Sequence, residues 1–266
     1  MIELFIALLV IPTLTITVWE VLVHKMSINA KRVYRATGYL GVPVHELSHA
    51  LVCILFGMRI TKIALYTPND ATGRMGGVDF RYSPYSIAHG VGLALHGIAP
   101  LVAGSAIVLL LLNAFHTVEA PELGFASVLT WLIGLGLSLL QAAWGMAVSG
   151  PLGFCAVLLA MIVSMHAIPS LADITAGMRG LIILMLMAGA VAIACDLFWV
   201  YESELGKSFG DLLVRVINHI EYGLWMAVYG VVAVLIMAVL GGVVLILVPS
   251  AGWYGVEFVQ GARGKI

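Results

Sequence analysis

The sequence predicts an all-α polytopic membrane protein with about six transmembrane helices and a small β-hairpin. Apolar residues make up 62% of the 266 residues and charged residues only 10%, whereas soluble domains have about 25% charged residues. Several apolar stretches reach the roughly 20 residues that a spanning helix needs. One intervening segment instead alternates apolar and polar residues with period two, as strands do. We therefore expect a single integral membrane domain over residues 1–266, with the lipid bilayer around it.

Two spanning helices are expected first, over about Leu4 to Val23 and about Gly38 to Met58. The chain begins without a basic region or a small-residue cleavage site, so we interpret the first stretch as a retained helix rather than a signal peptide. A polar segment, His24 to Arg35, separates the two helices. Because Pro43 lacks the N–H used in a helix interior, we expect it to kink the second helix or to begin its regular part.

A β-hairpin is expected after the second helix, between Arg59 and Pro84. The run Ile60 to Tyr66 is rich in strand formers, Pro68 to Gly73 has the composition of a turn, and Val78 to Tyr82 alternates with period two. Four Lys and Arg residues in this hairpin predict a cytoplasmic position by the positive-inside rule. The segment before the second helix also carries four and should lie on the opposite side, so the orientation stays open.

The next two apolar stretches each contain an interruption. The stretch from about Ile87 to Asn113 is expected to break or kink at Gly97–Pro100. The stretch from Gly124 to Ile168 is divided at Ser149-Gly150-Pro151. The first of its two pieces is compatible with a full span, a re-entrant piece or an interfacial helix.

The C-terminal part predicts three more helical segments. A spanning helix is expected over Leu181 to Val200 and the last one over about Leu224 to Val248. Between them, Glu202 to Tyr222 is amphipathic, so we expect this segment to lie along the membrane surface. Its apolar face consists of Phe209, Leu212, Leu213, Val216, Ile217 and Ile220.

The second apolar stretch contains the motif His45-Glu46-Leu47-Ser48-His49. Two histidines four residues apart face the same way on a helix and can bind one zinc ion. Glu46 lies just off that face, where it can act as a general base on a zinc-bound water. Ionisable groups inside membrane helices are costly and are usually functional. The motif therefore predicts zinc-dependent hydrolysis, specifically proteolysis, at a site within the membrane.

A catalytic zinc ion takes three protein ligands and leaves one position for water. The downstream histidine of the metzincins is absent, because Val52 and Leu55 occupy the positions of that pattern. Asp173 follows an apolar helix and a break at Pro169-Ser170, and broken helices at membrane depth line cavities. We therefore predict Asp173 as the third ligand. The alternative is that Asp173 caps a helix that begins near Ile174.

Three interpretations of His166, seven residues before Asp173, stay open. It could hydrogen-bond the substrate, orient a metal ligand from behind, or be a hydrogen-bonded buried histidine. His89 and His96, in the third helix, fit helix packing or a cavity wall better than zinc binding, although they are the best spare ligands.

Four blocks of sequence resemble the site-2 protease family of intramembrane zinc metalloproteases. The first is the HExxH motif, followed by Gly57–Ile60 at the family's spacing. The second, Gly76-Gly77-Val78, is similar to the family's Gly-Gly-Tyr-Val strand without its tyrosine, and the third, Gly97–Pro100, is similar to its small-residue Gly-Pro turn. The fourth, Pro169 to Asp173, stands in the place of the family's Asn-Pro…Leu-Asp-Gly motif. These blocks cover residues 38–180, which we expect to be a protease-like core, with C-terminal helices over 181–266.

The fourth block departs from the family pattern, because His166 stands where the family has asparagine and Ile174 replaces the glycine after the aspartate. It is similar to a bacterial branch with a His-x-x-Pro-Ser-x-x-Asp pattern, which implies the bacterial inner membrane as the location. The resemblance implies Asp173 as a metal ligand. It also implies roles in substrate binding, or in support of the metal ligands, for His166, Ser170, Gly76 and Gly77.

The resemblance implies that Glu46 and zinc together hydrolyse a peptide bond of a membrane-embedded protein substrate. A substrate helix must unwind first, and the edge of the hairpin could hold it as an added strand. One alternative is a catalytically inactive zinc-binding scaffold, in which a fourth ligand such as His166 closes the site. Another is a proton or metal transporter. The net charge of −1 gives no electrostatic case for a nucleic-acid partner.

Overall fold

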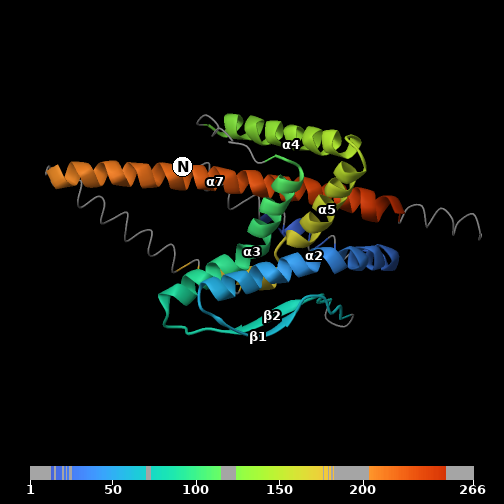
Figure 1. Ribbon diagram of the computed structural model, residues 1–266, viewed down its shortest axis with the longest axis horizontal. Coiled ribbons are helices and arrows are strands. Elements are labelled where there is room, and N and C mark those ends of the chain that lie inside the picture. Colours follow the sequence, from blue (N-terminus) through green and yellow to red (C-terminus); the bar gives the residue numbers. More distant parts are fainter. Residues whose placement is uncertain are drawn as a thin grey trace, which may run out of the picture.

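The computed structural model describes residues 26–69, 73–114, 124–175 and 204–249, together with scattered positions between 13 and 23 and between 177 and 182. Within these residues, helices α2, α3, α4, α5 and α7 pack together, and a two-stranded sheet lies beside α2 (Figure 1). The elements are α2 (Ile28–Leu55), β1 (Arg59–Ala64), β2 (Gly77–Arg81), α3 (Ile87–Leu111), α4 (Phe125–Val148), α5 (Pro151–Ala167), α7 (Glu204–Gly241) and the π-helical segment η1 (Gly242–Leu247).

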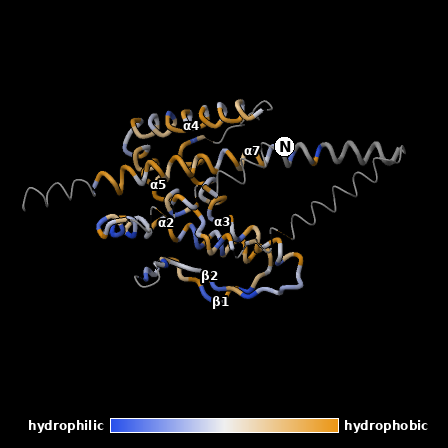
Figure 2. The backbone as a smooth tube through the Cα atoms, turned by 180° about the vertical axis from the view of Figure 1, so that it is seen from behind, coloured by the Kyte–Doolittle hydropathy of each residue, from blue (hydrophilic) through white to orange (hydrophobic). Residues whose placement is uncertain are grey.

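Four helical segments among the described residues are long and apolar enough to cross a membrane. They are Ile28–Leu55, Ile87–Leu111, Phe125–Val148 and Tyr222–Leu247. Hydrophobic residues dominate α4, α5 and α7, whereas hydrophilic residues gather on β1 and at one end of α2 (Figure 2). The chain is therefore a membrane protein with at least these four candidate spans. The expected helices over Leu4 to Val23 and Leu181 to Val200 fall largely outside the described residues.

The second helix is longer than expected. It begins at Ile28 instead of Gly38 and continues through Pro43 without interruption. The side chain of Ser27 caps its first turn, since its hydroxyl accepts a hydrogen bond from the N–H of Ala30 at 3.3 Å. Lysine and arginine are good helix formers, so the polar segment continues the helix instead of forming a loop.

The amphipathic segment and the last span form one helix, so the prediction of a separate surface helix was wrong. Helix α7 runs from Glu204 to Gly241 without a break. No proline separates the two segments, and the one glycine at their junction, Gly223, is tolerated inside a helix. The helix therefore continues from the amphipathic segment directly into the apolar span.

The interruptions expected in the other helices have different outcomes. Helix α3 continues through Pro100 and changes direction partway along (Figure 1), so it bends without breaking. Helices α4 and α5 are separated at Ser149 and Gly150, as expected. Gly150 has φ 142°, a conformation that favours glycine. With 24 residues, most of them apolar, α4 has the length and composition of a full span.

The predicted β-hairpin is confirmed as an antiparallel pair, with Lys62 opposite Asp79 and Ala64 opposite Gly77. Its inner face packs against α2 and α3, where Val78 joins a buried cluster that includes Cys53 and Leu93. The opposite face carries the charged side chains. Because period-two alternation places successive side chains on opposite faces, one face can pack while the other stays polar.

The hairpin folds back along α2 for most of that helix. Gly57 has φ 68° and reverses the chain directly after the helix. At the far end of the hairpin, the Tyr66 hydroxyl donates a hydrogen bond to the carbonyl oxygen of Arg35 at 2.7 Å. The ring of Tyr66 also contacts that of Tyr39, with 5.8 Å between the centroids. The strands therefore lie beside the part of α2 that contains the HExxH motif.

Candidate metal centre

His45 and His49 project from the same side of α2 because they are separated by four residues, about one helical turn. Their Nε2 atoms lie 3.1 Å apart, and their rings meet edge to face. His49 is buried, with 3% of its surface exposed, while His45 is partly buried. Two imidazole nitrogens thus point toward one position inside the helix assembly.

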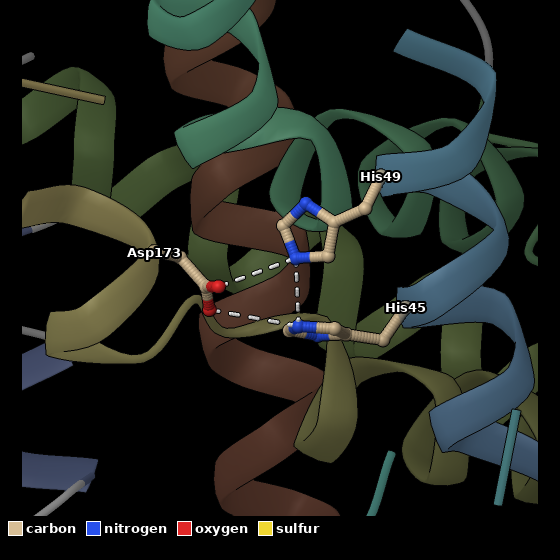
Figure 3. Close-up of side chains that lie close together, drawn as sticks. All are labelled: His45, His49 and Asp173. Carbon is tan, nitrogen blue, oxygen red and sulfur yellow. Dashed lines mark hydrogen bonds and ion pairs between the residues drawn. The ribbon is translucent and has the colours of Figure 1, made fainter. Parts of the chain in front are cut away.

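Asp173 completes the group from a segment that follows α5. Its Oδ2 lies 3.6 Å from Nε2 of His45, and its Oδ1 lies 3.4 Å from Nε2 of His49 (Figure 3). Ser170 holds the carboxylate from the other side, since its backbone N–H and its hydroxyl donate to Oδ2 at 2.8 and 2.7 Å. The aspartate is therefore oriented toward the two imidazoles.

The helix-capping interpretation of Asp173 needs a correction in detail. The short helix begins at Leu171 instead of Ile174. Ser170 is the capping residue, and Asp173 reaches back to it from the third helical position, as in a capping box. Asp173 is thus part of a helix cap and also lies beside the histidines. Its Oδ2 accepts the hydrogen bonds from Ser170 and faces His45, while its Oδ1 faces His49.

The three side chains lie close enough together to share one metal ion. Their ligand atoms all lie within 4.8 Å of one another. Ligands at the 2.0–2.1 Å usual for zinc lie about 3.3 Å apart around a tetrahedron. The two imidazole nitrogens are 3.1 Å apart, close to that value, and the carboxylate distances of 3.4 and 3.6 Å are made by different oxygens of Asp173. His45, His49 and Asp173 therefore form a group that could hold a metal ion.

The tautomer of His45 is set by the backbone of α5. Nδ1 of His45 lies 2.7 Å from the carbonyl oxygen of His166, and a carbonyl oxygen only accepts hydrogen bonds. Nδ1 therefore carries a proton, and in the neutral ring the lone pair of Nε2 is left for a metal. Metal-bound histidines are commonly oriented by such a hydrogen bond.

The side chain of His166 points away from the metal position and contacts α2. Its Nε2 lies 3.0 Å from the Thr37 hydroxyl, and its ring stacks on Tyr34 with 4.5 Å between the centroids. A side chain at Gly41 would collide with this ring, since its Cβ would lie 2.5 Å from Cδ2. His166 thus orients His45 through its carbonyl, while its imidazole is a hydrogen-bonded buried side chain.

Glu46 lies beneath the start of β2. Its side chain is buried, with 7% exposed. Gly76 lies so close that a Cβ there would be 2.7 Å from Oε1 of Glu46. A side chain at Gly77 would instead collide with the guanidinium of Arg74, whose Nε donates to the Gly76 carbonyl at 2.7 Å. Gly76 therefore lets the hairpin backbone approach the HExxH helix closely, whereas Gly77 leaves room for the Arg74 side chain.

The sequence predicted His96 only as a packing or cavity-wall residue and a spare ligand, and the structure places it against His49. His96 of α3 is buried, with 5% exposed, and stacks on His49 with 4.1 Å between the ring centroids. An unpaired histidine in an apolar helix was the only available signal. His89, seven residues earlier, accepts a hydrogen bond from the N–H of Ser83 at 2.8 Å and lies near the start of the helix.

Two opposing effects act on the pKa of the Asp173 carboxyl. Burial acts to raise the pKa of its carboxyl, but hydrogen bonds and charge interactions with His45 and His49 outweigh burial and lower that pKa. A carboxylate must be ionised to bind a metal ion.

Comparison with known proteins adds no further constraint on the site. No family model matches this chain, and neither a curated protein nor a solved structure matches it.

Proposed function

We propose that this protein is an intramembrane zinc metalloprotease that hydrolyses a peptide bond of a membrane-embedded protein. The observation that carries the proposal is the convergence of His45, His49 and Asp173, with Glu46 in the same helical turn. Two imidazoles and one carboxylate are a donor set typical of catalytic zinc. The sequence resemblance to a bacterial branch of site-2 proteases supports this assignment and suggests the bacterial inner membrane as the location.

The donor set supports an open site. Among the described residues the cluster has three members, whereas structural zinc sites are closed by four protein ligands. The His166 imidazole, the candidate for a fourth ligand, is engaged with Thr37 and Tyr34. This arrangement favours the enzyme over the inactive scaffold.

Each residue of the group has a defined task in the proposed reaction. A bound zinc ion lowers the pKa of a water ligand and polarises the scissile carbonyl. The carboxylate of Glu46 would accept a proton from the attacking water and deliver it to the leaving amine nitrogen. Burial of Glu46 beneath Gly76 keeps its carboxylate close to the two histidines, with which it interacts electrostatically. His166 and Ser170 hold the ligands His45 and Asp173.

The hairpin supports a route for the substrate. Peptide bonds in a transmembrane helix are hydrogen-bonded within the helix, so a protease must bind a segment that has unwound. A two-stranded sheet has free edges, and an extended segment can pair with one of them. Because β2 begins beside Glu46, a segment paired with this hairpin would pass near the metal position.

The decisive experiment combines metal analysis with a cleavage assay in proteoliposomes. Purified protein would be incubated with single-span membrane proteins of varied sequence, and products would be located by mass spectrometry. We expect about one zinc ion per chain and cleavage within or next to the span, which is lost in Glu46→Gln. Zinc binding without cleavage of any substrate in the set would favour the scaffold. Metal flux into the vesicles would favour a transporter.

A further inference from the structure

We propose that two consecutive residues of α3, His96 and Gly97, position two of the three metal ligands. This inference rests on the proposed metal site. His96 acts on His49, and Gly97 acts on Asp173. Helix α3, which donates no ligand of its own, would thereby hold the ligands from α2 and from the segment after α5 close together.

His96 lies flat against a metal ligand. The planes of His96 and His49 differ by 23° and their centroids are 4.1 Å apart. The ring of Phe80, which belongs to β2, also contacts His96, with 4.6 Å between the ring centroids. Because the two imidazoles are nearly parallel, the in-plane lone pairs of His96 do not point at an ion held in the plane of His49. His96 therefore contacts the ligand through its ring face.

The stack takes the place of a hydrogen bond that His49 lacks. A metal-bound histidine usually donates its second N–H to an acceptor, as His45 does to the carbonyl of His166. In the part of the chain that the structure describes, Nδ1 of His49 has no hydrogen-bond partner, and neither has either nitrogen of His96. A metal-bound imidazole gains positive charge, and an aromatic face stabilises a cation that lies over it. The ring of His96 supplies that face.

Gly97 allows the backbone of Asp173 to approach α3. A Cβ at Gly97 would lie 2.8 Å from the carbonyl oxygen of Asp173 and 3.3 Å from Cα of Gly177. Both neighbours are backbone atoms, so they cannot rotate away as a flexible side chain could. Any larger residue at position 97 must push the Asp173 segment away from the two histidines, and thus lengthen the distances across the metal site.

The role of His96 is tested by the zinc affinity of the full-length protein in detergent, measured by competition with a chromophoric chelator. We expect His96→Leu to weaken zinc binding about 10- to 100-fold, the usual effect of losing support behind a metal ligand. His96→Phe keeps an aromatic face and should bind zinc nearly as the wild type does. The matched control is His89→Leu on the same helix, which should not change the affinity. Wild-type affinity in His96→Leu, or an equal loss in His96→Phe, would overturn this role.

The role of Gly97 is tested by a double-mutant cycle with Asp173. Gly97→Ala should weaken zinc binding in the wild-type background but cause no further loss in Asp173→Ala, because it acts through that carboxylate. Gly134→Ala in α4, where no atom lies within 4 Å of the added Cβ, is the control for a glycine-to-alanine change. Equal losses in both backgrounds would show a general effect on folding and refute the proposal, as would an unchanged affinity in Gly97→Ala.

A spectroscopic readout separates positioning from folding. Cobalt(II) substituted for zinc reports ligand geometry through its visible absorption, and we expect Gly97→Ala and His96→Leu to alter that absorption while Gly134→Ala does not. These measurements need no substrate. If His45→Ala left zinc binding unchanged, the metal site itself would be wrong, whereas failure of the α3 variants alone would leave the site and the proposed protease intact.

Discussion

The Nδ1 nitrogen of His45 lies 2.7 Å from the carbonyl oxygen of His166, 121 residues further along the chain. This hydrogen bond joins α2 to the end of α5, directly before the segment that carries Asp173. A single contact thus orients one metal ligand and anchors the chain that supplies another. The imidazole of His166 strengthens the same junction through its contacts with Thr37 and Tyr34.

The junction predicts that Thr37→Val destabilises the protein and weakens zinc binding. The change leaves Nε2 of buried His166 without its partner, which costs about 1–3 kcal/mol in the free energy of unfolding. Denaturant unfolding in detergent measures the stability, and chelator competition measures the affinity. Tyr34→Phe is the control, because it keeps the stacked ring and leaves the Thr37–His166 contact in place, while removing a long 3.4 Å hydrogen bond to the Met165 carbonyl. Equal effects of the two variants would contradict this explanation.

Removal of a ligand should empty the metal site. Asp173→Ala and His49→Ala are each expected to reduce the bound zinc from about one ion per chain to a small fraction, since two remaining ligands bind zinc weakly. Elemental analysis of purified protein after dialysis measures this content. Chelation of the wild type should abolish cleavage, and added zinc should restore it. Ser138→Ala, in α4, serves as a control for purification. Full zinc occupancy in Asp173→Ala would exclude Asp173 as a ligand.

Glu46→Gln should separate metal binding from chemistry. The amide keeps the size of the side chain but cannot accept a proton from water, so we expect unchanged zinc content and a fall in kcat of about 10²–10⁴-fold. Single-turnover cleavage in proteoliposomes measures the rate. A variant that cleaves at the wild-type rate would show that another group is the base.

Gly76→Ala should impair catalysis without loss of zinc. The new Cβ would lie 2.7 Å from Oε1 of Glu46 and 2.8 Å from the side chain of Val42, so the carboxylate or the hairpin must move. We expect a lower kcat with a normal metal content. Gly145→Ala, which introduces a methyl group into open space on α4, should leave both unchanged. Normal turnover in Gly76→Ala would mean that the close approach of β2 to Glu46 is not needed.

Local patterns in the sequence were sufficient to predict the hairpin, the break between α4 and α5, and the same-face placement of His45 and His49. Each of these depends on residues close together in the chain. The start of α2 and the continuity of α7 were missed, because charged residues are compatible both with a loop and with a helix that extends beyond the apolar layer.

Contacts between distant elements could not be predicted in this way. The stack of His96 on His49 depends on how α3 packs against α2, and a histidine among apolar residues does not reveal its neighbour. The bond from His45 to the carbonyl of His166 uses a backbone atom that every residue possesses. The proximity of Asp173 was inferred from its position after a helix break, but its hydrogen bonds with Ser170 follow from the fold of that turn.

The hairpin beside α2 has a consequence for the lipids around it. Its outward side forms a shallow pocket lined by Lys62, Arg74 and Asp79, at the level of a helix that is apolar enough to cross the bilayer. Acyl chains cannot solvate ammonium and guanidinium groups or the free edge of a strand. If the hairpin lies at the depth of this span, headgroups and water rather than acyl chains must therefore surround its outward side.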